Sequence, residues 1–463
     1  MIKKFVHIIA TVIVVTNFSF SQSIEDLINQ VSSANLQTNV SILSGEQSAT
    51  INGSNQTIAS RFHSNNDLAA DFIREQFEGL PNLTVEVQNF NTTGKNIIAT
   101  QLGQTSPDDV YIVCAHYDSV NIYCADDNAT GVAAVIEMAR ILSGQCTDNT
   151  IVYALWDEEE IGLRGANYYA QQAADDTNGN TRDNILAVVN MDMIGYDGDA
   201  PGTAGDNDFD IDVRNVANSL AIVSDLQQIL TDYTFNLNPI IVNPGTDASD
   251  HARFWNEGYS AVLVGESWET NDRTPDYHTA DDRVDDLDFQ YMTEITKLVL
   301  TYMATKADLV DLDNSVTQSS TSLTANQASA SYQWYNCDTN TIIPGATNQT
   351  FVPTVNGNYR VSISNGSCEE ISACYNFTTL SAEEFTKEDI QIYPNPVNNI
   401  LNISNNTNTK LHISVVDITG KEIKKLKSKK ESIQINLKNN ASGVYFIKLT
   451  SKAKSSTYRF VKD

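Results

Sequence analysis

Strand-like and helix-like segments alternate over residues 23–307, and this alternation limits the possible folds more than any other feature of the chain. Apolar runs typical of buried strands lie at 110–115, 151–156, 186–190 and 261–264. Apolar residues from Val132 to Leu142 recur at helical spacing, and a further helix is predicted over 289–304. Alternation of this kind is typical of α/β domains. We therefore predict an α/β/α sandwich with a mixed, largely parallel central sheet over residues 23–307.

The pattern changes beyond residue 307, where two small all-β domains are predicted. Residues 308–323 are polar and rich in Asp and Ser, as in a linker. Residues 324–380 contain two strand-like runs, 332–337 and 357–363, which we expect to pair and which resemble immunoglobulin-like repeats of secreted enzymes. Residues 391–463 carry 13 Lys and Arg against 4 Asp and Glu. That excess of positive charge marks them as a separate module.

The remainder of the chain is strongly acidic. Of the 29 basic and 58 acidic residues in the whole chain, 16 and 54 lie before residue 391, a net charge of −38. A surface with this charge repels phosphate groups, which argues against nucleic acid and anionic membranes as partners. Apolar residues make up 41% of the chain, so a sizeable core is expected and a wholly disordered chain is excluded.

The N-terminus predicts export. Lys3 and Lys4 precede an apolar run over 5–15, and Ser19 and Ser21 occupy positions typical of a cleavage site, so residues 1–21 are predicted to be a signal peptide. The run is too short for an ordinary membrane span. Export permits disulfides. Among the six cysteines we expect a Cys124–Cys146 bridge, with Cys114 buried and unpaired. The pairing of the last three, Cys337, Cys368 and Cys374, is left open.

Polar side chains follow three of the predicted strands. The strand at 110–115 is followed by His116, the strand at 151–156 by an acidic run over 157–160, and the strand at 186–190 by Met191 and Asp192. In open α/β sheets, ligands bind beyond the carboxyl ends of the strands. The loops at 125–131 and 277–282 add further carboxylates and His278. Each residue alone also fits a solvated surface or a helix cap. Together, nitrogen and carboxylate donors in this mixture suit zinc.

Five motifs, in order along the chain, resemble those of the dizinc aminopeptidase family, which includes secreted bacterial leucyl aminopeptidases and glutamate carboxypeptidase II. The similarity spans about residues 60–307. The motifs are His116-x-Asp118-Ser119, Asp127-Asn128-Ala129-Thr130-Gly131, Glu159-Glu160-Ile161-Gly162-Leu163-Arg164-Gly165, Asn190-Met191-Asp192 and His278-Thr279.

The resemblance implies a role for each matching residue. His116 and Asp192 match the side-chain ligands of one zinc ion, Glu160 and His278 match those of the other, and Asp127 matches the carboxylate that bridges both. The remaining matches are Glu159 as general base and Asp118 as the carboxylate that orients His116. Two neighbouring acids compete with these assignments: Asp126 also fits by chemistry but not by its spacing to Gly131, and Glu158 precedes the matched pair and is left over.

The chemistry that the resemblance implies is hydrolysis of the N-terminal peptide bond by a secreted zinc exopeptidase. Two zinc ions would share one water and lower its pKa, and Glu159 would take the proton and pass it to the leaving amine. An oxyanion donor is also needed, for which Tyr277 and Thr246 are candidates. The segment 249–251 is expected to support the pocket and not to bind metal.

Several alternatives are compatible with parts of this pattern. A carboxypeptidase of the same fold would need a cation near the metals, which Arg164, Arg253 or Arg273 could supply. A glutaminyl cyclase would use one zinc ion, whereas this set supplies ligands for two. A non-catalytic adhesin, suggested by the immunoglobulin-like segment, predicts broken ligand motifs. Serine hydrolase and nucleotide-binding motifs are absent. The preferred N-terminal residue is left open.

The tail also has a family resemblance. The segments Ile392-Tyr393-Pro394-Asn395-Pro396, Val415-Val416-Asp417-Ile418-Thr419-Gly420 and Ala441-Ser442-Gly443-Val444-Tyr445-Phe446 are similar to those of the C-terminal sorting domain of type IX secretion in gliding and related gram-negative bacteria. The resemblance implies that the type IX secretion machinery is a partner. It also implies passage across the outer membrane, removal of this domain, and a secreted or cell-surface location.

Overall fold

The computed structural model describes residues 23–198, 206–310, 312–365, 368–378, 384–451 and 454–463. The predicted signal peptide at 1–21 lies outside this range. Contacts divide the chain into two compact units, the first of which contains the α/β domain. Among the described residues, no helix combines the length and the apolar character needed to cross a membrane.

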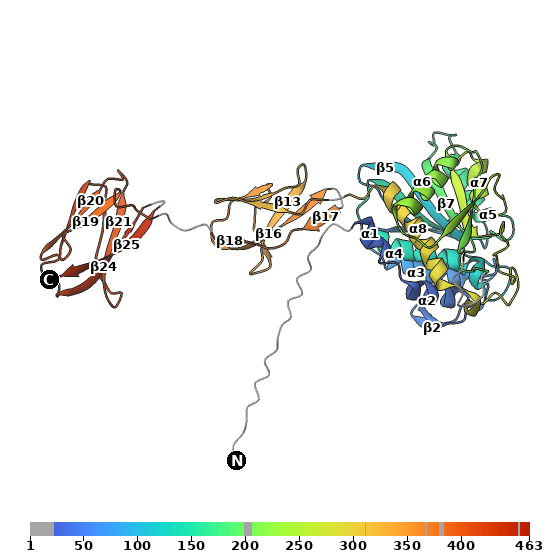
Figure 1. The fold of residues 1–463 in the computed structure, drawn as a ribbon, viewed down its shortest axis with the longest axis horizontal. Helices are drawn as coiled ribbons and strands as arrows, with labels where there is room; N and C mark the ends of the chain where they lie inside the picture. The colour runs from blue at the N-terminus through green and yellow to red at the C-terminus, as the bar shows by residue number, and fades with distance from the viewer. Residues whose placement is uncertain (1–22, 199–205, 311, 366–367, 379–383, 452–453) are drawn as a thin grey trace, which may run out of the picture. The chain divides into compact units, whose positions relative to one another are not determined.

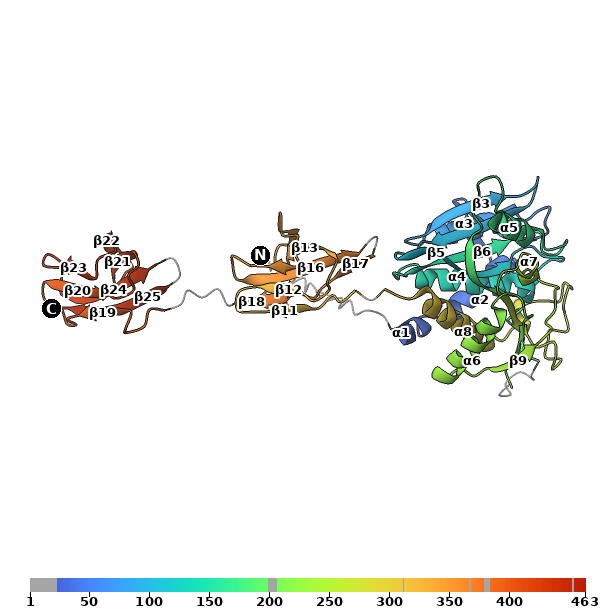
Figure 2. The ribbon, with the colours of Figure 1, turned by 90° about the horizontal axis from the view of Figure 1, so that it is seen from above.

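An eight-stranded sheet forms the centre of the first unit, in the order β3-β4-β6-β5-β7-β10-β8-β9 (Figures 1 and 2). β6, β5, β7 and β10 run parallel, as do β8 and β9, whereas β3/β4, β4/β6 and β10/β8 are antiparallel. The sheet is therefore mixed with a parallel centre, as predicted. The strands are β3 (Thr84–Asn89), β4 (Lys95–Gln101), β5 (Ser106–His116), β6 (Asn149–Trp156), β7 (Asn184–Met191), β8 (Asp208–Asp212), β9 (Asn238–Val242) and β10 (Ala261–Glu266).

Helices cover both faces of this sheet, which gives the predicted three layers (Figure 1). Side chains alternate along each strand. Val113 and Ala115 of β5 pack against α4 and α8, whereas Ile112 and Cys114 face the layer that contains α5 and α7. The helices are α1 (Ile24–Ile28), α2 (Ser33–Leu43), α3 (Asp67–Glu78), α4 (Gly131–Leu142), α5 (Arg164–Ala174), α6 (Ser219–Asp232), α7 (His251–Asn256) and α8 (Phe289–Ala307).

Small antiparallel sheets make up the C-terminal region, as expected. β13 (Ser331–Asn336) lies beside β16 (Gly357–Asn365), which confirms the pairing of the two strand-like runs. The expected linker at 308–323 is wrong in part. Its second half contains β11 (Val316–Gln318) and the start of β12 (Leu323–Ala325), which pair with each other. Alternating residues such as Val316 and Leu323 are buried there, a pattern that the polar composition concealed.

Two further sheets follow within residues 390–462. They comprise β19-β20-β23 and β22-β21-β24-β25. The inward-facing residues of the central strands, among them Ile413, Val415, Ile447 and Leu449, are fully buried in one cluster. The strands are β19 (Ile390–Tyr393), β20 (Ile400–Asn405), β21 (Leu411–Asp417), β22 (Glu422–Ser428), β23 (Ser432–Asn436), β24 (Gly443–Thr450) and β25 (Ser455–Lys462).

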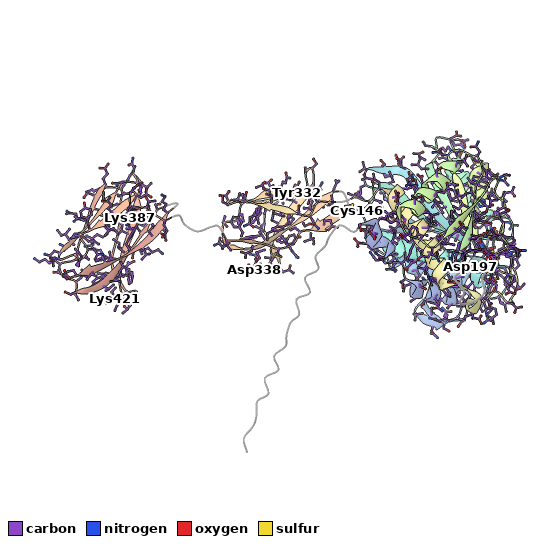
Figure 3. The ribbon with its side chains drawn as sticks, in the orientation of Figure 1. Cys146, Asp197, Tyr332, Asp338, Lys387 and Lys421 are labelled. Carbon is purple, nitrogen blue, oxygen red and sulfur yellow. A yellow bond between two sulfur atoms is a disulfide. The ribbon has the colours of Figure 1, made fainter. Side chains whose placement is uncertain are left out.

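The disulfide pairing differs from the prediction. Cys146 is bonded to Cys368, with the two Cα atoms 5.6 Å apart, and Cys337 is bonded to Cys374 (Cys146 is labelled in Figure 3). Cys124 is buried and free, so the expected Cys124–Cys146 bridge is wrong, whereas Cys114 is free as expected. The reason is α4, which separates the two positions. Its 12 residues span about 18 Å, far more than the reach of a disulfide.

Candidate active site

The carboxyl ends of three parallel strands bring the predicted site residues together. His116 is the last residue of β5 and lies beside Trp156, the last residue of β6. Asp192 directly follows β7, and Glu159 and Glu160 lie in the turn after β6. A cavity of about 540 Å³ opens at this edge, and its lining includes all six predicted catalytic and metal-ligating residues: His116, Asp127, Glu159, Glu160, Asp192 and His278.

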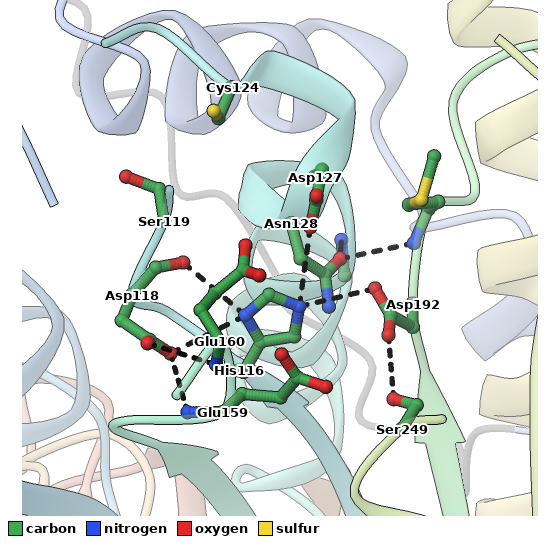
Figure 4. Close-up of polar contacts among 12 residues, drawn as sticks. His116, Asp118, Ser119, Cys124, Asp127, Asn128, Glu159, Glu160, Asp192 and Ser249 are labelled. Atoms are coloured by element: carbon green, nitrogen blue, oxygen red, sulfur yellow. Dashed lines mark hydrogen bonds and ion pairs between the residues drawn. The ribbon is translucent and has the colours of Figure 1, made fainter. Parts of the chain in front are cut away.

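The five predicted ligands form two halves that meet at Asp127. In the strand half, His116 Nε2 lies 3.2 Å from Asp192 Oδ1 and 3.4 Å from Asp127 Oδ1 (Figure 4). In the loop half, His278 Nε2 lies 3.2 Å from Asp127 Oδ2 and 3.3 Å from Glu160 Oε2. The two oxygens of Asp127 therefore face different histidines. One carboxylate placed in this way can bridge two cations.

The site contains buried carboxylate oxygens that no hydrogen bond satisfies, and it therefore favours a bound cation. Asp127 Oδ2 and Glu160 Oε1 are buried and accept no hydrogen bond. Burial, followed by the charge of Asp127, raises the pKa of Glu160 to about 8. Ligand atoms of His116, Asp127 and Glu160 lie within 4.8 Å of one another, as do those of His116, Glu159 and Asp192. Buried carboxylates without partners are costly, and a cation bound between them removes that cost. The residues present fit metal ions, and imidazole with carboxylate suits zinc.

The turn after β6 separates the three glutamates. Glu159 lines the cavity, and burial raises its pKa well above the usual value. Glu158 has a positive φ of 59° and its side chain lies elsewhere: its Oε2 accepts hydrogen bonds from Asn91 Nδ2 at 2.8 Å and from Arg164 at 3.2 Å. The structure therefore places Glu159 and Glu160 in the cavity and leaves Glu158 outside it.

Asp118 supports both the histidine and the glutamates. Its Oδ1 lies 3.5 Å from His116 Nδ1 and accepts a hydrogen bond from the backbone N–H of Glu159 at 3.0 Å. Its Oδ2 accepts from the N–H of Glu160 at 3.3 Å (Figure 4). One carboxylate thus orients the ring of His116 and fixes the backbone of the β6 turn. The sequence predicted the first contact but not the second.

Ser249 gives Asp192 a comparable support. Its hydroxyl donates to Asp192 Oδ2 at 2.6 Å and accepts from Asn190 Nδ2 at 2.8 Å. Neighbouring His251 does not line the cavity, and its Nε2 hydrogen-bonds the carbonyl of Thr246 at 3.0 Å. The segment 249–251 therefore holds the pocket in place, in line with the expectation for it.

Two residues to which the sequence analysis gave no role hold the loop that carries Asp127. The buried guanidinium of Arg61 donates to the carbonyls of Asp127 at 3.2 Å and of Cys124 at 2.7 Å. The carboxylate of Asp282 accepts from the N–H of Asp126 at 2.8 Å and of Asp127 at 3.1 Å. No motif marks Arg61, and only its nearness to His278 in the chain draws attention to Asp282.

Asp126 is turned away from the cavity. Its Oδ1 accepts from the N–H of Gly195 at 2.9 Å and from the hydroxyl of Thr130 at 3.2 Å. Burial and the nearby Asp282 raise its pKa to about 7. Asp127, and not Asp126, reaches the two histidines, as the spacing to Gly131 suggested.

Both candidate oxyanion donors line the cavity. The ring of Tyr277 stacks on that of His278, with centroids 3.7 Å apart. Burial, followed by the carboxylates on both halves of the site, raises the pKa of Tyr277. The hydroxyl of Thr246 already accepts from the N–H of Ala248 at 3.2 Å. Tyr277 therefore stands closer to the charged groups of the site.

Comparison with known families agrees with this geometry. Residues 96–303 match peptidase family M28, and residues 391–463 match the secretion system C-terminal sorting domain. The first range contains every predicted site residue from His116 to His278. The second covers the basic tail with its seven strands.

Curated relatives resemble about half of the chain. Leucine aminopeptidase 1 of Trichophyton equinum is 31% identical over 228 residues, which are 46% of this chain and 58% of that protein. The uncharacterized protein YfbL of Escherichia coli is 27% identical over 269 residues, 51% of this chain and 79% of that protein. The chain thus spans somewhat more than half the length of the first relative.

Solved structures support the fold. The LapA aminopeptidase of Legionella pneumophila superposes with a TM-score of 0.52 at 18% identity, over 62% of this chain and 75% of that one. LapB of the same organism gives a TM-score of 0.51 at 21% identity, over 61% and 74%. Together with the family matches, this identifies residues 96–303 as a domain that matches peptidase family M28 and residues 391–463 as one that matches the secretion system C-terminal sorting domain.

Proposed function

We propose that this protein is a secreted zinc aminopeptidase that removes N-terminal residues from peptides with the help of two zinc ions. The observation that carries the proposal is the position of Asp127, whose two oxygens face His116 and His278. Membership of a peptidase family and the aminopeptidase names of the relatives support the reaction class.

Each half of the site would hold one ion. His116 and Asp192 would bind the first, Glu160 and His278 the second, and Asp127 both. Bound zinc would supply a Lewis acid that polarises the scissile carbonyl and lowers the pKa of water. The protein contributes the rigidity of the ligands, through Asp118 on His116 and Ser249 on Asp192.

Glu159 would move the proton. It lines the cavity without a predicted ligand role, and its backbone is fixed by Asp118. Its carboxylate would accept a proton from the attacking water and deliver it to the leaving amine. Tyr277 would donate its hydroxyl hydrogen to the developing oxyanion, because that hydroxyl has no hydrogen-bond partner among the described residues.

The surroundings of the cavity favour an aminopeptidase over a carboxypeptidase. A carboxypeptidase needs a cation for the substrate carboxylate, yet no Lys or Arg of the described residues lines the cavity. Arg164 pairs with Glu158 at 3.2 Å, Arg253 donates to the carbonyl of Gly162, and Arg273 lies over the ring of Trp268. The acidic lining instead suits the ammonium group of a free N-terminus.

Export is part of the proposal. The sorting domain at 391–463 supports transfer by the type IX machinery, and the expected signal peptide would direct the first step across the inner membrane. The domain plan proposed is that of the sequence analysis, with the linker shortened by the strand at Val316–Gln318.

A substrate panel tests the proposed function. The purified protein is assayed with aminoacyl amides, N-acetylated peptides and carboxypeptidase substrates, before and after chelation. We expect cleavage of substrates with a free N-terminus only, lost with the chelator and restored by zinc. Release of C-terminal residues, or equal cleavage of N-acetylated peptides, would contradict the proposal.

A further inference from the structure

The cavity extends from the metal-ligand end over one face of β10, β8 and β9. In the register of these strands, Leu263 lies opposite Asp212 and Gly265 opposite Asp210, and Val242 lies beside Asp212. All five residues line the cavity. The alternate residues of β8, Phe209 and Ile211, are buried in the core on the other face. Two aspartates on one strand thus form part of the cavity floor.

The two aspartates are engaged differently. Both carboxylate oxygens of Asp210 have hydrogen-bond donors. They accept from Ser267 Oγ at 2.7 Å and from the N–H groups of Trp268 and Glu269. Asp212 Oδ1 accepts from the N–H of Thr246 at 2.7 Å, but its Oδ2 has no partner among the described residues, although the residue is only 7% exposed. A carboxylate oxygen that lines a cavity and has no partner from the protein can accept a hydrogen bond from a ligand.

Among the described residues no cation pairs with Asp212 Oδ2, although the charge of Arg214 acts on Asp212. Arg214, two residues further along, directs its guanidinium to the carbonyl of Gly245 at 2.9 Å and to Asp247 at 3.3 Å. Glu269 lines the same end of the cavity and adds negative charge. Burial, with Asp210 and Glu269 nearby, raises the pKa of Asp212 to about 6, so the group is mostly ionised at pH 8.

Apolar side chains accompany these charges. Val242 and Leu263 flank Asp212 on the floor, and Trp268 lines the wall with its ring perpendicular to that of Tyr277. Gly265 adds no side chain between this floor and Asp192, since a Cβ there would lie 2.6 Å from the backbone oxygen of Asp192. Apolar side chains and the carboxylate of Asp212 thus line the same cavity as the metal-ligand end.

We propose that this part of the cavity selects an N-terminal residue with a long cationic side chain, lysine or arginine, whose aliphatic stem lies along Val242 and Leu263 and whose charged end pairs with Asp212. The inference rests on the proposed function and specifies its substrate class. A charged hydrogen bond to a buried carboxylate contributes about 1.5–3 kcal/mol, which corresponds to roughly 10–150-fold in kcat/KM.

The test compares lysine with norleucine, which has the same stem but lacks the ammonium group. The full protein with zinc is assayed at pH 8 with lysyl, arginyl, norleucyl and leucyl amides. We expect kcat/KM for lysine to exceed that for norleucine by about tenfold or more. Equal values, or a preference for norleucine, would overturn the inference while leaving the aminopeptidase proposal intact. If no free N-terminus were cleaved, the proposed function itself would fail.

Two variants assign the preference to a residue. Asp212→Asn keeps size and the contact with Thr246 but removes the charge, and should lower the ratio of lysine to norleucine about tenfold. Asp208→Asn is the matched control, since Asp208 lies on the same strand and face, outside the cavity lining, with Asn238 as its partner. An unchanged ratio in Asp212→Asn would show that the carboxylate instead serves the α-amino group or nothing, and would overturn the assignment.

Discussion

The strand half and the loop half of the candidate site use the same ligand types but are built differently. His116 and Asp192 stand at the ends of β5 and β7, and the side chain of His116 is only 2% exposed. His278 lies in a loop and its side chain is 40% exposed. Asp118 and Ser249 hold the ligands of the strand half, whereas Glu160 Oε1 has no hydrogen-bond partner.

The difference bears on how tightly each half would keep an ion. Ligands fixed by buried partners lose little freedom when a metal binds, whereas a half-exposed loop histidine must be ordered. We therefore expect the strand half to bind zinc more tightly and to release it more slowly. The loop half would be the first to empty under a chelator.

The largest expected effect is on kcat, and it distinguishes the general base Glu159 from the metal ligands. Glu159→Gln keeps the size of the side chain but removes the proton acceptor, so kcat should fall about 10²–10⁴-fold with zinc content unchanged. Assay and metal analysis of the same sample measure both. Because Glu159 lies within 4.8 Å of the strand-half ligands, loss of that zinc would show that it is a ligand.

Its neighbours are the controls for that experiment. Glu160→Gln should weaken zinc binding in the loop half, because an amide is a poorer ligand than a carboxylate. Glu158→Gln should leave kcat near the wild-type value, since Glu158 contacts Asn91 and Arg164 outside the cavity. If Glu158→Gln were inactive but kept its metal, the general base would be Glu158 and not Glu159.

The next effect contrasts the two histidines. His278→Ala should remove zinc from the loop half alone, and His116→Ala should remove it from the strand half, in each case weakening binding by more than about 100-fold, the upper range for partners that only touch a ligand. Competition with a fluorescent chelator measures each affinity. Equal loss of both ions in His278→Ala would remove the distinction between the halves.

A smaller effect concerns the support of Asp192. Ser249→Ala removes the hydroxyl that donates to Asp192 at 2.6 Å, and should weaken zinc binding in the strand half about 10–100-fold. Zinc in the loop half should be unaffected, which the same competition assay resolves. Weakening of both ions to the same degree would point to a general disturbance of the fold.

The site residues that directly follow strands were the easier ones to predict. A strand that ends in a polar residue is a local pattern, and parallel strands deliver such ends to one edge, so His116, Asp192 and the glutamates could be placed from the strand pattern. The family resemblance then identified Asp127 and His278 as ligands. The order of segments likewise sufficed for the sandwich fold, because its core strands are continuous apolar runs.

Long-range partners could not be predicted. Arg61 contacts Asp127 across 66 positions and Cys146 joins Cys368 across 222, and no local pattern encodes either contact. The Cys124–Cys146 pairing was wrong because it was predicted from closeness in sequence, without regard to the length of α4, which separates the two residues. Asp212 escaped notice because a short alternating strand of aspartates resembles a solvated segment until the neighbouring strands are placed.

Zinc titration of the metal-free protein tests the central claim most directly. Metal analysis at saturation, combined with affinity measurement, should give two zinc ions per chain in the wild type, with the tighter step abolished in His116→Ala and the weaker step abolished in His278→Ala. A single ion at saturation in a fully active wild-type protein would contradict the two-half site built around Asp127.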